Sequence, residues 1–596
     1  MKKGRKLLST LLAVSTAIGS LGCMTACAED ITPRIVCIEA DQLTAGDWWD
    51  AGGTVTLEQA RSNALVIQEA LDTLGQSGGG TVVLPEGTYC LAGDYKTYET
   101  YCLYIRYDNL TLRGAGKDGD RHRTVLKANA HWNAAAGTPH EELVYRNSGI
   151  RIEGLDFNAE GRARTNITLE GFELDGCRGW SNASDWGYDP TINYGWDVNH
   201  KGITVAHDKM VHNVRLHDIN IHSFSGETLY VGGQLVGYLE VTDCIMADTN
   251  ASCFNLYAAW LNVQNCQFGS PDKNCRFWIE YSPRAAYAHF DESLVPDSFP
   301  YEKNTAYFAG NSFYNSRNAN GIALAQGDCS TYTVIFEKNY FDNKNGQPNF
   351  SLFQLAGAIY GPVYIRENTF HNTRGPVLNF AFGGAGTLDE NGVYGDWSAN
   401  KNIYLENNVG TDVGGDYIID MCNNFNSTGS QPIENLVIRG NHFTAKESRF
   451  VAVGVGGTSE LKNVLIEGNT FVNCVEPRET SPFVGNVPLF RSNTYEKTAS
   501  AEVQLIDAGN TRINPFYEKL YVRANGDTTA SLRVGKYEDG HTVTITIAKY
   551  TAPVTFAAND PSLGYALNQD YVLKSGDTLT LKYDAAQTLW VLADGQ

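Results

Sequence analysis

The chain has 596 residues and a formal net charge of −21, with 46 Lys and Arg against 67 Asp and Glu. This length exceeds what a single compact core usually needs. The acidic balance argues against nucleic acid as a partner, and against electrostatic capture of an acidic polysaccharide without a basic groove or a bridging calcium ion. A neutral substrate therefore fits the composition better.

Residues 1–28 have the features of an export signal peptide. A basic stretch from Lys2 to Lys6 precedes an apolar run from Leu7 to Gly19, and Ala26-Cys27-Ala28 fits a cleavage site. Cys23 and Cys27 each follow a small residue, which leaves a lipoprotein alternative open. No later stretch is long and apolar enough to span a membrane. We expect a secreted or surface-anchored protein, whose charge without the four basic residues of this leader is about −25.

Residues 29–100 are expected to form a lead-in and a cap. From Leu57 to Leu74 apolar residues recur at helical spacing, and the run ends at Gly75 and the triplet Gly78–Gly80. Thr81 to Tyr89 then has the pattern of a strand and a turn. This arrangement resembles the amino-terminal cap of right-handed parallel β-helix proteins, the pectin-lyase-like superfamily. The resemblance implies an all-β chain in which residues 101–512 form a right-handed parallel β-helix behind a short helical cap.

A repeat runs through the middle of the chain. It consists of an apolar run, an asparagine close to Phe or Val, a turn and a second apolar run. Its asparagines are Asn265, Asn311, Asn339, Asn368, Asn407, Asn441 and Asn469. Their spacings of 46, 28, 29, 39, 34 and 28 residues are typical of stacked supersecondary units. In such a stack the asparagines are expected to form a structural ladder of side-chain amides. The inward-facing residues are expected to include Val334, Ile365, Val437 and Val464.

Two pairs of cysteines share the period of a short coil. Cys244 and Cys266 are 22 residues apart, and so are Cys253 and Cys275, so the members of each pair should lie on neighbouring coils. Rungs about 4.8 Å apart are within reach of a disulfide, and buried free thiols are the alternative. An odd number of cysteines, eleven, follows the leader, and no CxxC pair suggests a structural zinc site.

Residues 513–596 change character. Val543–Phe556 and Tyr571–Leu592 alternate apolar and polar residues between Gly and Asp turns, which predicts a small β-sandwich-like domain. It resembles the carboxy-terminal domains that follow β-helices in tailspikes and in some glycan-active enzymes. Trimerisation, glycan binding and capping of the β-helix all stay open as its role, and so does the oligomeric state.

A row of polar residues is expected along one outer face of the coils. The row comprises Glu280, Gln326, Gln354, Asn379 and Asp420. Its first three members lie 15 residues after their asparagine markers, and the other two follow matching apolar runs. Trp278, two residues before Glu280, is expected on the same face. Amides, carboxylates and an aromatic ring suit a sugar-binding groove, and an ordinary solvated face is the alternative.

The 39-residue step of the repeat contains a glycine-rich insert, GGAGTLDENGVYGDWSAN, at the end of this row. Glycoside cleavage usually needs one carboxyl group that protonates the leaving oxygen and a second that attacks or activates water. We predict that Asp389 and Asp396 are this catalytic pair, since the glycines permit turns that bring them together. Trp397 is predicted to wall the site and to raise the pKa of one acid by desolvation. Glu280 and Asp420 are the reserve pair, and a solvated loop is the alternative.

The pair of aspartates also carries a family resemblance. An Asp-x6-Asp pair followed by an aromatic residue, on a late coil of a secreted β-helix, resembles the lacto-N-biosidases of glycoside hydrolase family 136. The resemblance implies release of lacto-N-biose from neutral oligosaccharides that contain N-acetylhexosamine, with retention. Asp396 would be the nucleophile and Asp389 the acid/base, and the polar row would hold the sugar rings. It also implies a dedicated folding chaperone, since some members have a chaperone-like helical domain or a separate partner.

No cofactor and no metal site are expected. The histidines at positions 207, 212, 217 and 222 recur at a five-residue step, but a strand places those on one face too far apart for one metal ion. Two other hypotheses stay open. One is another β-helix carbohydrate enzyme, either a polysaccharide lyase or a fructan transferase. The other is a non-catalytic glycan-binding surface protein, which would more often have regular coils and no glycine-rich insert.

Overall fold

The computed structural model describes residues 34–93, 100–128, 147–157, 162–177, 200–205, 209–224, 226–231, 235–249, 251–256, 258–271, 277–281, 289–316, 322–324, 332–345, 351–355, 362–380, 400–423, 433–457, 460–479, 484–485, 488–497, 504–508, 511–513, 515, 519–535, 537, 539–548, 551–558 and 560–593. The chain forms two compact units. The first unit is Met1–Cys275 with Ala286–Lys303, and the second is Arg276–Ala285 with Asn304–Gln596. The predicted signal peptide lies outside the described residues.

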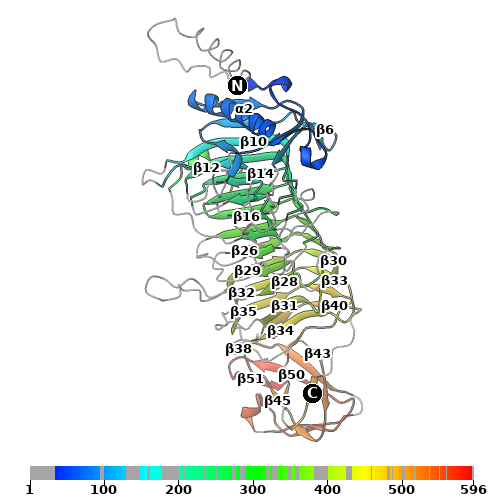
Figure 1. The fold of residues 1–596 in the computed structure, drawn as a ribbon. Helices are drawn as coiled ribbons and strands as arrows, with labels where there is room; N and C mark the ends of the chain where they lie inside the picture. The colour runs from blue at the N-terminus through cyan, green and yellow to red at the C-terminus, as the bar shows by residue number, and fades with distance from the viewer. Residues whose placement is uncertain are drawn as a thin grey trace, which may run out of the picture. The chain divides into compact units, whose positions relative to one another are not determined.

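The lead-in of the first unit ends in a helix of 20 residues (Figure 1). Its elements are β1 (Ile35–Cys37), η1 (Ala40–Gln42), η2 (Trp49–Ala51) and α2 (Leu57–Gln76). Thr56 caps α2, since its hydroxyl accepts a hydrogen bond from the Gln59 backbone while the Gln59 side chain accepts one from the Thr56 backbone. The apolar stripe of α2, with Ile67 and Leu71, is fully buried, which confirms the predicted helix.

Behind the cap, the first unit consists of coils whose strands pair in parallel in three series. The first series is β2 (Gly80–Val83), β5 (Leu110–Arg113), β10 (Arg164–Asp175), β12 (Val211–His222), β14 (Tyr238–Thr242) and β17 (Trp260–Gln264). The second is β3 (Gly87–Leu91), β8 (Thr124–Ala128), the later parts of β10 and β12, β15 (Ile245–Ala247) and β18 (Gln267–Phe268). The third is β4 (Thr100–Ile105), β9 (Asn147–Ile152), β11 (Ile203–Val205), β13 (Leu229–Val231) and β16 (Ser252–Leu256). A hairpin of β6 (Lys117–Asp118) and β7 (Arg121–His122), and the turn η4 (Glu292–Leu294), also belong to this unit.

The second unit repeats this arrangement. Its first series is β20 (Thr305–Ala309), β23 (Thr333–Glu337), β26 (Val363–Arg366), β29 (Asn400–Glu406), β32 (Ile433–Arg439), β35 (Glu460–Glu467), β38 (Val484–Gly485) and β39 (Leu489–Arg491). Its second is β21 (Ser312–Tyr314), β24 (Tyr340–Asp342), β27 (Thr369–His371), β30 (Val409–Val413), β33 (His442–Ala445), β36 (Thr470–Val472) and β40 (Thr494–Glu496). Its third is β19 (Phe277–Tyr281), β22 (Ile322–Leu324), β25 (Phe353–Leu355), β28 (Leu378–Phe380), β31 (Tyr417–Asn423), β34 (Val451–Gly457) and β37 (Arg478–Glu479). The predicted right-handed parallel β-helix is thereby confirmed.

The core of the second unit is a set of inward columns. One column, from the third series, is Ile279, Ile322, Phe353, Leu378, Ile419 and Val453, all buried. Of the residues predicted to face inward, Val334, Ile365 and Val464 are buried. The prediction for Val437 is wrong, since this residue is only half-buried and pairs with Tyr404 on the outer face. Its apolar neighbours on both sides point inward instead, so the run did not reveal which residues alternate toward the core.

Asparagines form a hydrogen-bonded ladder inside the second unit. Its members are Asn311, Asn339, Asn368, Asn408, Asn441, Asn469 and Asn493. Each Nδ2 donates to the Oδ1 of the next member at 2.8–3.0 Å, which confirms the predicted amide ladder. The member predicted as Asn407 is in fact Asn408. Asn407, the residue before this ladder member, instead has a left-handed backbone conformation with φ of 55°. Asn265 of the first unit occupies a similar turn, with φ of 56°.

The cysteine pair Cys244 and Cys266 lies on neighbouring coils of the first unit, as predicted. The backbone N–H of Gln267 donates to the Cys244 carbonyl at 2.8 Å, which fixes the register. Both side chains are buried and neither is in a disulfide, so the stacking is confirmed and the disulfide is not formed. Burial, reinforced by Cys244, raises the pKa of Cys266 well above its usual range. Cys253 is also free, and Cys275 lies outside the described residues.

The parallel winding continues beyond residue 512. The strands β41 (Gln504–Ile506), β43 (Lys519–Ala524) and β46 (Thr542–Ile547) pair in parallel, as do β42 (Arg512–Ile513) with β45 (Ser531–Leu532) and β44 (Thr528–Thr529) with β47 (Val554–Phe556). Antiparallel pairing begins only with β49 (Tyr571–Leu573), β50 (Thr578–Asp584) and β51 (Leu589–Leu592), which follow η5 (Pro561–Leu563) and β48 (Tyr565–Ala566). A strand before residue 513 thus shares a sheet with the predicted terminal domain, whose limits stay a prediction.

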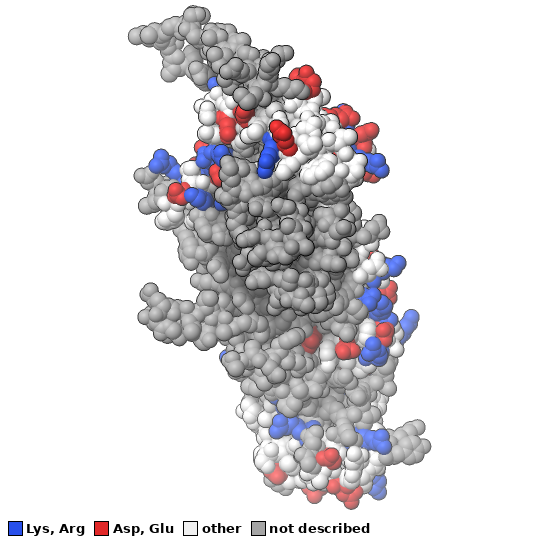
Figure 2. Space-filling view, in the orientation of Figure 1, with Lys and Arg blue, Asp and Glu red and all other residues white. Residues whose placement is uncertain are grey.

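Charges on the described surface are mixed. In Figure 2, acidic and basic side chains are interspersed over the described residues of this face. On the outer face of the second unit, glutamate and arginine alternate on successive rungs as Glu337, Arg366, Glu406, Arg439, Glu467 and Arg491. Arg366 contacts Glu337 at 2.7 Å and Arg439 contacts Glu406 at 2.6 Å. In the described part of the chain, no helix has the length and apolar character needed to cross a membrane.

Candidate functional site

The structure assembles most of the predicted polar row on the third strand series of the second unit. Gln354 pairs with Asn379, and Asn379 pairs with Asp420, on the adjacent strands β25, β28 and β31. All three are half-buried between inward apolar neighbours, as alternation along a strand requires. Glu280, on β19, is half-buried in the same register, with one strand between it and Gln354.

The residue on that intervening strand differs from the prediction. β22 places Ala323 between Glu280 and Gln354, whereas Gln326 follows the strand and lies outside the described residues. The prediction of Gln326 in the row is therefore wrong. Ala323 lies 12 residues after Asn311, while Gln354 lies 15 after its marker, so the turns between the strands differ in length. A count from one marker cannot anticipate such a difference.

Trp278 does not face outward, and its prediction as a substrate-binding residue is wrong. Its side chain is fully buried, and its indole N–H donates to the Tyr314 carbonyl at 2.9 Å. The ring packs against Phe313 and Phe341, with centroids 5.6 and 5.9 Å away. Trp278 and its neighbour Ile279 are both buried near the start of β19, so strict alternation of inward and outward side chains fails there.

Asn379 and Asp420 form the best-defined polar contact of the row. The Asn379 side chain donates from Nδ2 to Asp420 Oδ2 at 2.9 Å. The Asn379 amide oxygen is buried and has no hydrogen-bond partner among the described residues. Since buried acceptors in native proteins are nearly always paired, this oxygen is available to a donor outside the described set. Asp420 pairs next with Gly454, which has no side chain to cover that flank of the carboxylate.

The predicted catalytic insert follows the strand that carries Asn379. That strand, β28, ends at Phe380, and the next described strand, β29, begins at Asn400. Asp389, Asp396 and Trp397 all fall between these two anchors and lie outside the described residues. Their roles stay predictions, and the structure fixes only where the segment that contains them departs.

A second site, in the first unit, escaped the sequence analysis. A pocket of about 290 Å³ is lined by Asp47, Trp48, Ala51, Lys127, Asp175, Cys177 and Ser223. Its residues come from the lead-in and from three coils of unequal length. The pocket could have been found from the register of β8, β10 and β12, which aligns Lys127, Asp175 and His222. The coils that carry Lys127, Asp175 and Ser223 precede Asn265, the first asparagine marker, so the repeat could not be used to align them.

Metal-binding geometry is absent from the part of the chain that the structure describes, where no group of three or more His, Cys, Asp and Glu side chains could hold an ion. His212 is buried and accepts from the Tyr238 backbone at 2.8 Å, while His222 contacts Glu173 at 3.1 Å. These two histidines therefore serve different local networks.

Comparison with known proteins yields fold similarity at low identity. No family model matches the chain, and no curated protein matches its sequence. Among solved structures, the A-module of the mannuronan C-5 epimerase AlgE6 of Azotobacter vinelandii is 15% identical with a TM-score of 0.39, over 74% of this chain and 96% of that one. The catalytic unit of a GH87 alpha-1,3-glucanase of Streptomyces thermodiastaticus is 15% identical with a TM-score of 0.39, over 73% and 64%. The tailspike of E. coli bacteriophage HK620 is 13% identical with a TM-score of 0.38, over 83% and 77%. Similarities this low assign no activity to the chain.

Proposed function

We propose that the protein is a secreted or surface-anchored glycoside hydrolase that acts on neutral oligosaccharides containing N-acetylhexosamine. The observation that carries the proposal is the polar row on the second unit, which the two-aspartate insert follows in the sequence. Gln354, Asn379 and Asp420 lie on adjacent strands, and β28, which carries Asn379, ends at Phe380, three residues before the insert begins. The proposal therefore joins a polar surface to the two carboxylic acids that come next in the chain.

The chemistry of the row suits sugar hydroxyl groups. A carboxylate accepts hydrogen bonds, while a carboxamide both donates and accepts, so the row can match hydroxyls in either role. Neighbouring strands are about 4.8 Å apart, so Gln354, Asn379 and Asp420 would present one polar side chain on each of three successive rungs to an extended glycan. The row carries the carboxylates of Glu280 and Asp420, and the chain as a whole has a net negative charge. Both favour a neutral glycan over an acidic one.

In this proposal Asp389 protonates the glycosidic oxygen, and Asp396 attacks the anomeric carbon. Water activated by Asp389 then releases the sugar from Asp396, which retains the anomeric configuration. The family resemblance supplies these two roles and the finer substrate, lacto-N-biose units of milk-type oligosaccharides. It also supplies the expected partner, a dedicated folding chaperone. Trp397 would exclude water from the acid that must stay protonated.

The test is hydrolysis of lacto-N-tetraose by the folded, purified protein, produced with and without a candidate chaperone and followed by mass-resolved chromatography. We expect release of a disaccharide by the wild type and its loss in Asp389→Asn and in Asp396→Asn. Asp416→Asn is the matched control, since this carboxylate is 73% exposed on the same unit. Loss of a general acid or a nucleophile should lower the rate by at least about a hundredfold.

Three results would contradict the proposal. If both aspartate variants keep full activity while Glu280→Gln and Asp420→Asn lose it, the catalytic pair is wrong. Unsaturated products that absorb in the ultraviolet would show a lyase. No product from any neutral glycan, with saturable glycan binding retained, would show a non-catalytic binding protein.

A further inference from the structure

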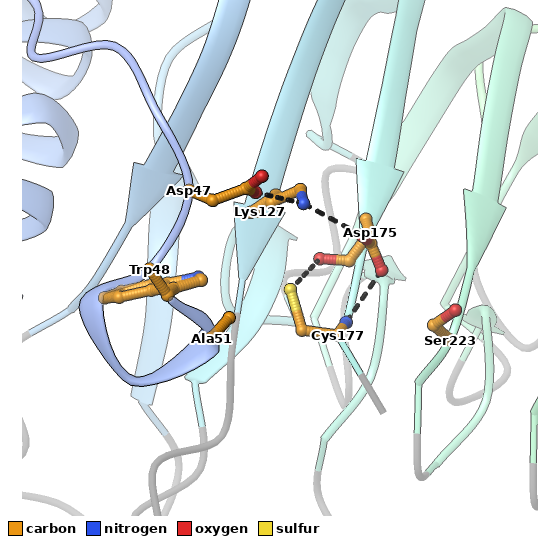
Figure 3. Close-up of a pocket in the computed structure, with 7 residues that line it drawn as sticks. All are labelled: Asp47, Trp48, Ala51, Lys127, Asp175, Cys177 and Ser223. Carbon is orange, nitrogen blue, oxygen red and sulfur yellow. Dashed lines mark hydrogen bonds and ion pairs between the residues drawn. The ribbon is translucent and has the colours of Figure 1, made fainter. Parts of the chain in front are cut away.

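The pocket in the first unit combines a charged rim with an apolar floor (Figure 3). Lys127 and Asp175 reach it from β8 and β10, and Ser223 follows β12. The lead-in supplies Asp47 and Trp48, which Figure 3 shows opposite these strands. A segment far away in sequence thus forms one wall of the pocket, opposite a three-strand surface.

Ion pairs hold the rim in place. The Lys127 ammonium contacts the Asp47 carboxylate and lies 3.9 Å from Asp175 Oδ2. Burial by itself lowers the pKa of Lys127, but the hydrogen bond to Asp47 and the neighbouring acidic groups outweigh it, so the pKa is raised and the ammonium stays charged. The Cys177 backbone N–H donates to Asp175 Oδ1 at 2.8 Å, which orients that carboxylate. The rim therefore presents a fixed cation between two fixed anions.

A second layer fixes the far end of the pocket. His222 Nε2 lies 3.1 Å from Glu173, and its Nδ1 lies 2.8 Å from the Ser223 hydroxyl. Ser223 in turn donates to Asp248 at 3.2 Å. Ser223 has φ of 60°, a left-handed backbone that turns its hydroxyl toward the pocket end of β12. Its side chain is therefore held in one orientation by two partners.

The floor is apolar. Trp48 is buried in a cluster with Val55, Cys90 and Cys177. Burial, followed by the charge of Asp175, raises the pKa of the Cys177 thiol well above its usual range, so it stays protonated and offers no nucleophile. Its S–H lies 3.7 Å from the Asp175 carbonyl. The pocket thus combines an apolar surface with polar groups that hydrogen bonds and ion pairs hold in place. Small-molecule sites usually have this composition.

The charge balance selects among ligands. Four carboxylates, those of Asp47, Glu173, Asp175 and Asp248, surround one lysine and one histidine in this network. An anionic ligand would meet net repulsion. The volume, about 290 Å³, lies at the lower end of the ~300–1,000 Å³ typical of ligand pockets. A small, uncharged molecule with hydroxyl edges and an apolar face fits both limits.

We propose that this pocket binds a single uncharged sugar ring, with its apolar face toward the side formed by Ala51 and the edge of Trp48, and its hydroxyls toward Lys127 and Asp175. The carboxylates accept hydrogen bonds from the hydroxyls, and the ammonium donates to them. The site is built wholly from first-unit residues and shares none with the proposed catalytic row. It would therefore hold a glycan end independently of hydrolysis.

The test uses saturation-transfer NMR on the full chain. The probes are methyl β-D-galactopyranoside and methyl N-acetyl-β-D-glucosaminide, with D-galacturonate as the anionic probe. We expect transfer to the ring protons of a neutral glycoside and none to galacturonate. Lys127→Gln and Asp175→Asn should each weaken the Kd about tenfold, the order expected for one charged hydrogen bond. Lys401→Gln, which removes an ion-paired lysine of the second unit, should leave it unchanged.

The outcomes separate this site from the proposed function. No transfer to either neutral glycoside, equal transfer to galacturonate, or unchanged Kd in both pocket variants would overturn the proposal. Asp389→Asn should bind the glycosides as the wild type does, so a protein without hydrolase activity can still support this site. Ser223→Ala, a smaller change, gives a further test if either charged variant fails to show the wild-type unfolding transition.

Discussion

Replacing one asparagine of the ladder tests whether these side chains hold the coils together. Asn408 is fully buried, and its Nδ2 donates to Asn441 Oδ1 at 2.8 Å and to the Ile365 carbonyl at 2.9 Å. Its Oδ1 accepts from the backbone N–H of Asn368 at 2.9 Å and from the Asn368 side chain at 3.0 Å. We therefore expect Asn408→Ala to remove four buried hydrogen bonds.

The expected loss follows from these contacts. Each intramolecular hydrogen bond contributes about 1 kcal/mol net, so the free energy of unfolding should fall by about 4 kcal/mol. Some partners keep a second bond, since the Asn368 side chain still donates to the Phe336 carbonyl at 3.0 Å. The backbone N–H of Asn368 and the Ile365 carbonyl each lose a partner, so the expected loss of unfolding free energy stays near this value.

The assay is urea unfolding followed by circular dichroism, together with amide hydrogen exchange of β27 and β30. Exchange is needed because stacked coils can unfold in steps. Thr411→Ala is the matched control, since Thr411 is exposed on β30, the strand that Asn408 directly precedes, and its replacement should change stability by less than about 0.5 kcal/mol. If Asn408→Ala costs no more than this control, the ladder does not stabilise the stack and the reasoning is refuted.

Three further perturbations test other parts of the structure. Burial by itself raises the pKa of Glu173, but its hydrogen bond from His222 and nearby positive charges outweigh it, so the pKa lies below the usual 4.5. The stability from this contact is present above the usual pKa of a glutamate and is lost as the pH falls through the lowered pKa of Glu173. Glu173→Gln should therefore flatten the decline in unfolding free energy between pH 6 and pH 3. An unchanged profile would contradict the contact. Glu406→Arg puts like charges on adjacent rungs, so it should lower the unfolding temperature more than Glu406→Gln does, and 1 M salt should narrow the gap by screening. In Gly53→Ala the new Cβ would meet the Asp47 carbonyl at 2.2 Å, so we expect a loss of about 1–3 kcal/mol in urea unfolding and weaker sugar binding by the pocket, whereas wild-type stability would show that the lead-in adapts.

The sequence determined the elements and their stacking. The helix begins at a capping box and ends just before a glycine triplet. Both are local signals, so its position could be predicted within a few residues. The spacing of the asparagines predicted stacked units, because a repeat of this length must bury its apolar face against the next copy, and the resemblance of the cap to known β-helix proteins supplied the parallel β-helix. The polar row was predicted at Gln354, Asn379 and Asp420 because each lies two residues after the start of a matching apolar run, and the strand pairing confirms that they are adjacent.

The tertiary structure alone decided the register and direction of several side chains. The row contains Ala323 rather than Gln326 because turn lengths differ from coil to coil, and Trp278 points into the core, where it packs against Phe313 and Phe341. The pocket of the first unit depends on pairing between strands far apart in sequence, which placed Lys127 beside Asp175 and brought the lead-in over both. Local patterns specify which residues form strands. Which side chains meet across strands depends on the lengths of the intervening turns, and the periodicity of the sequence does not contain that information.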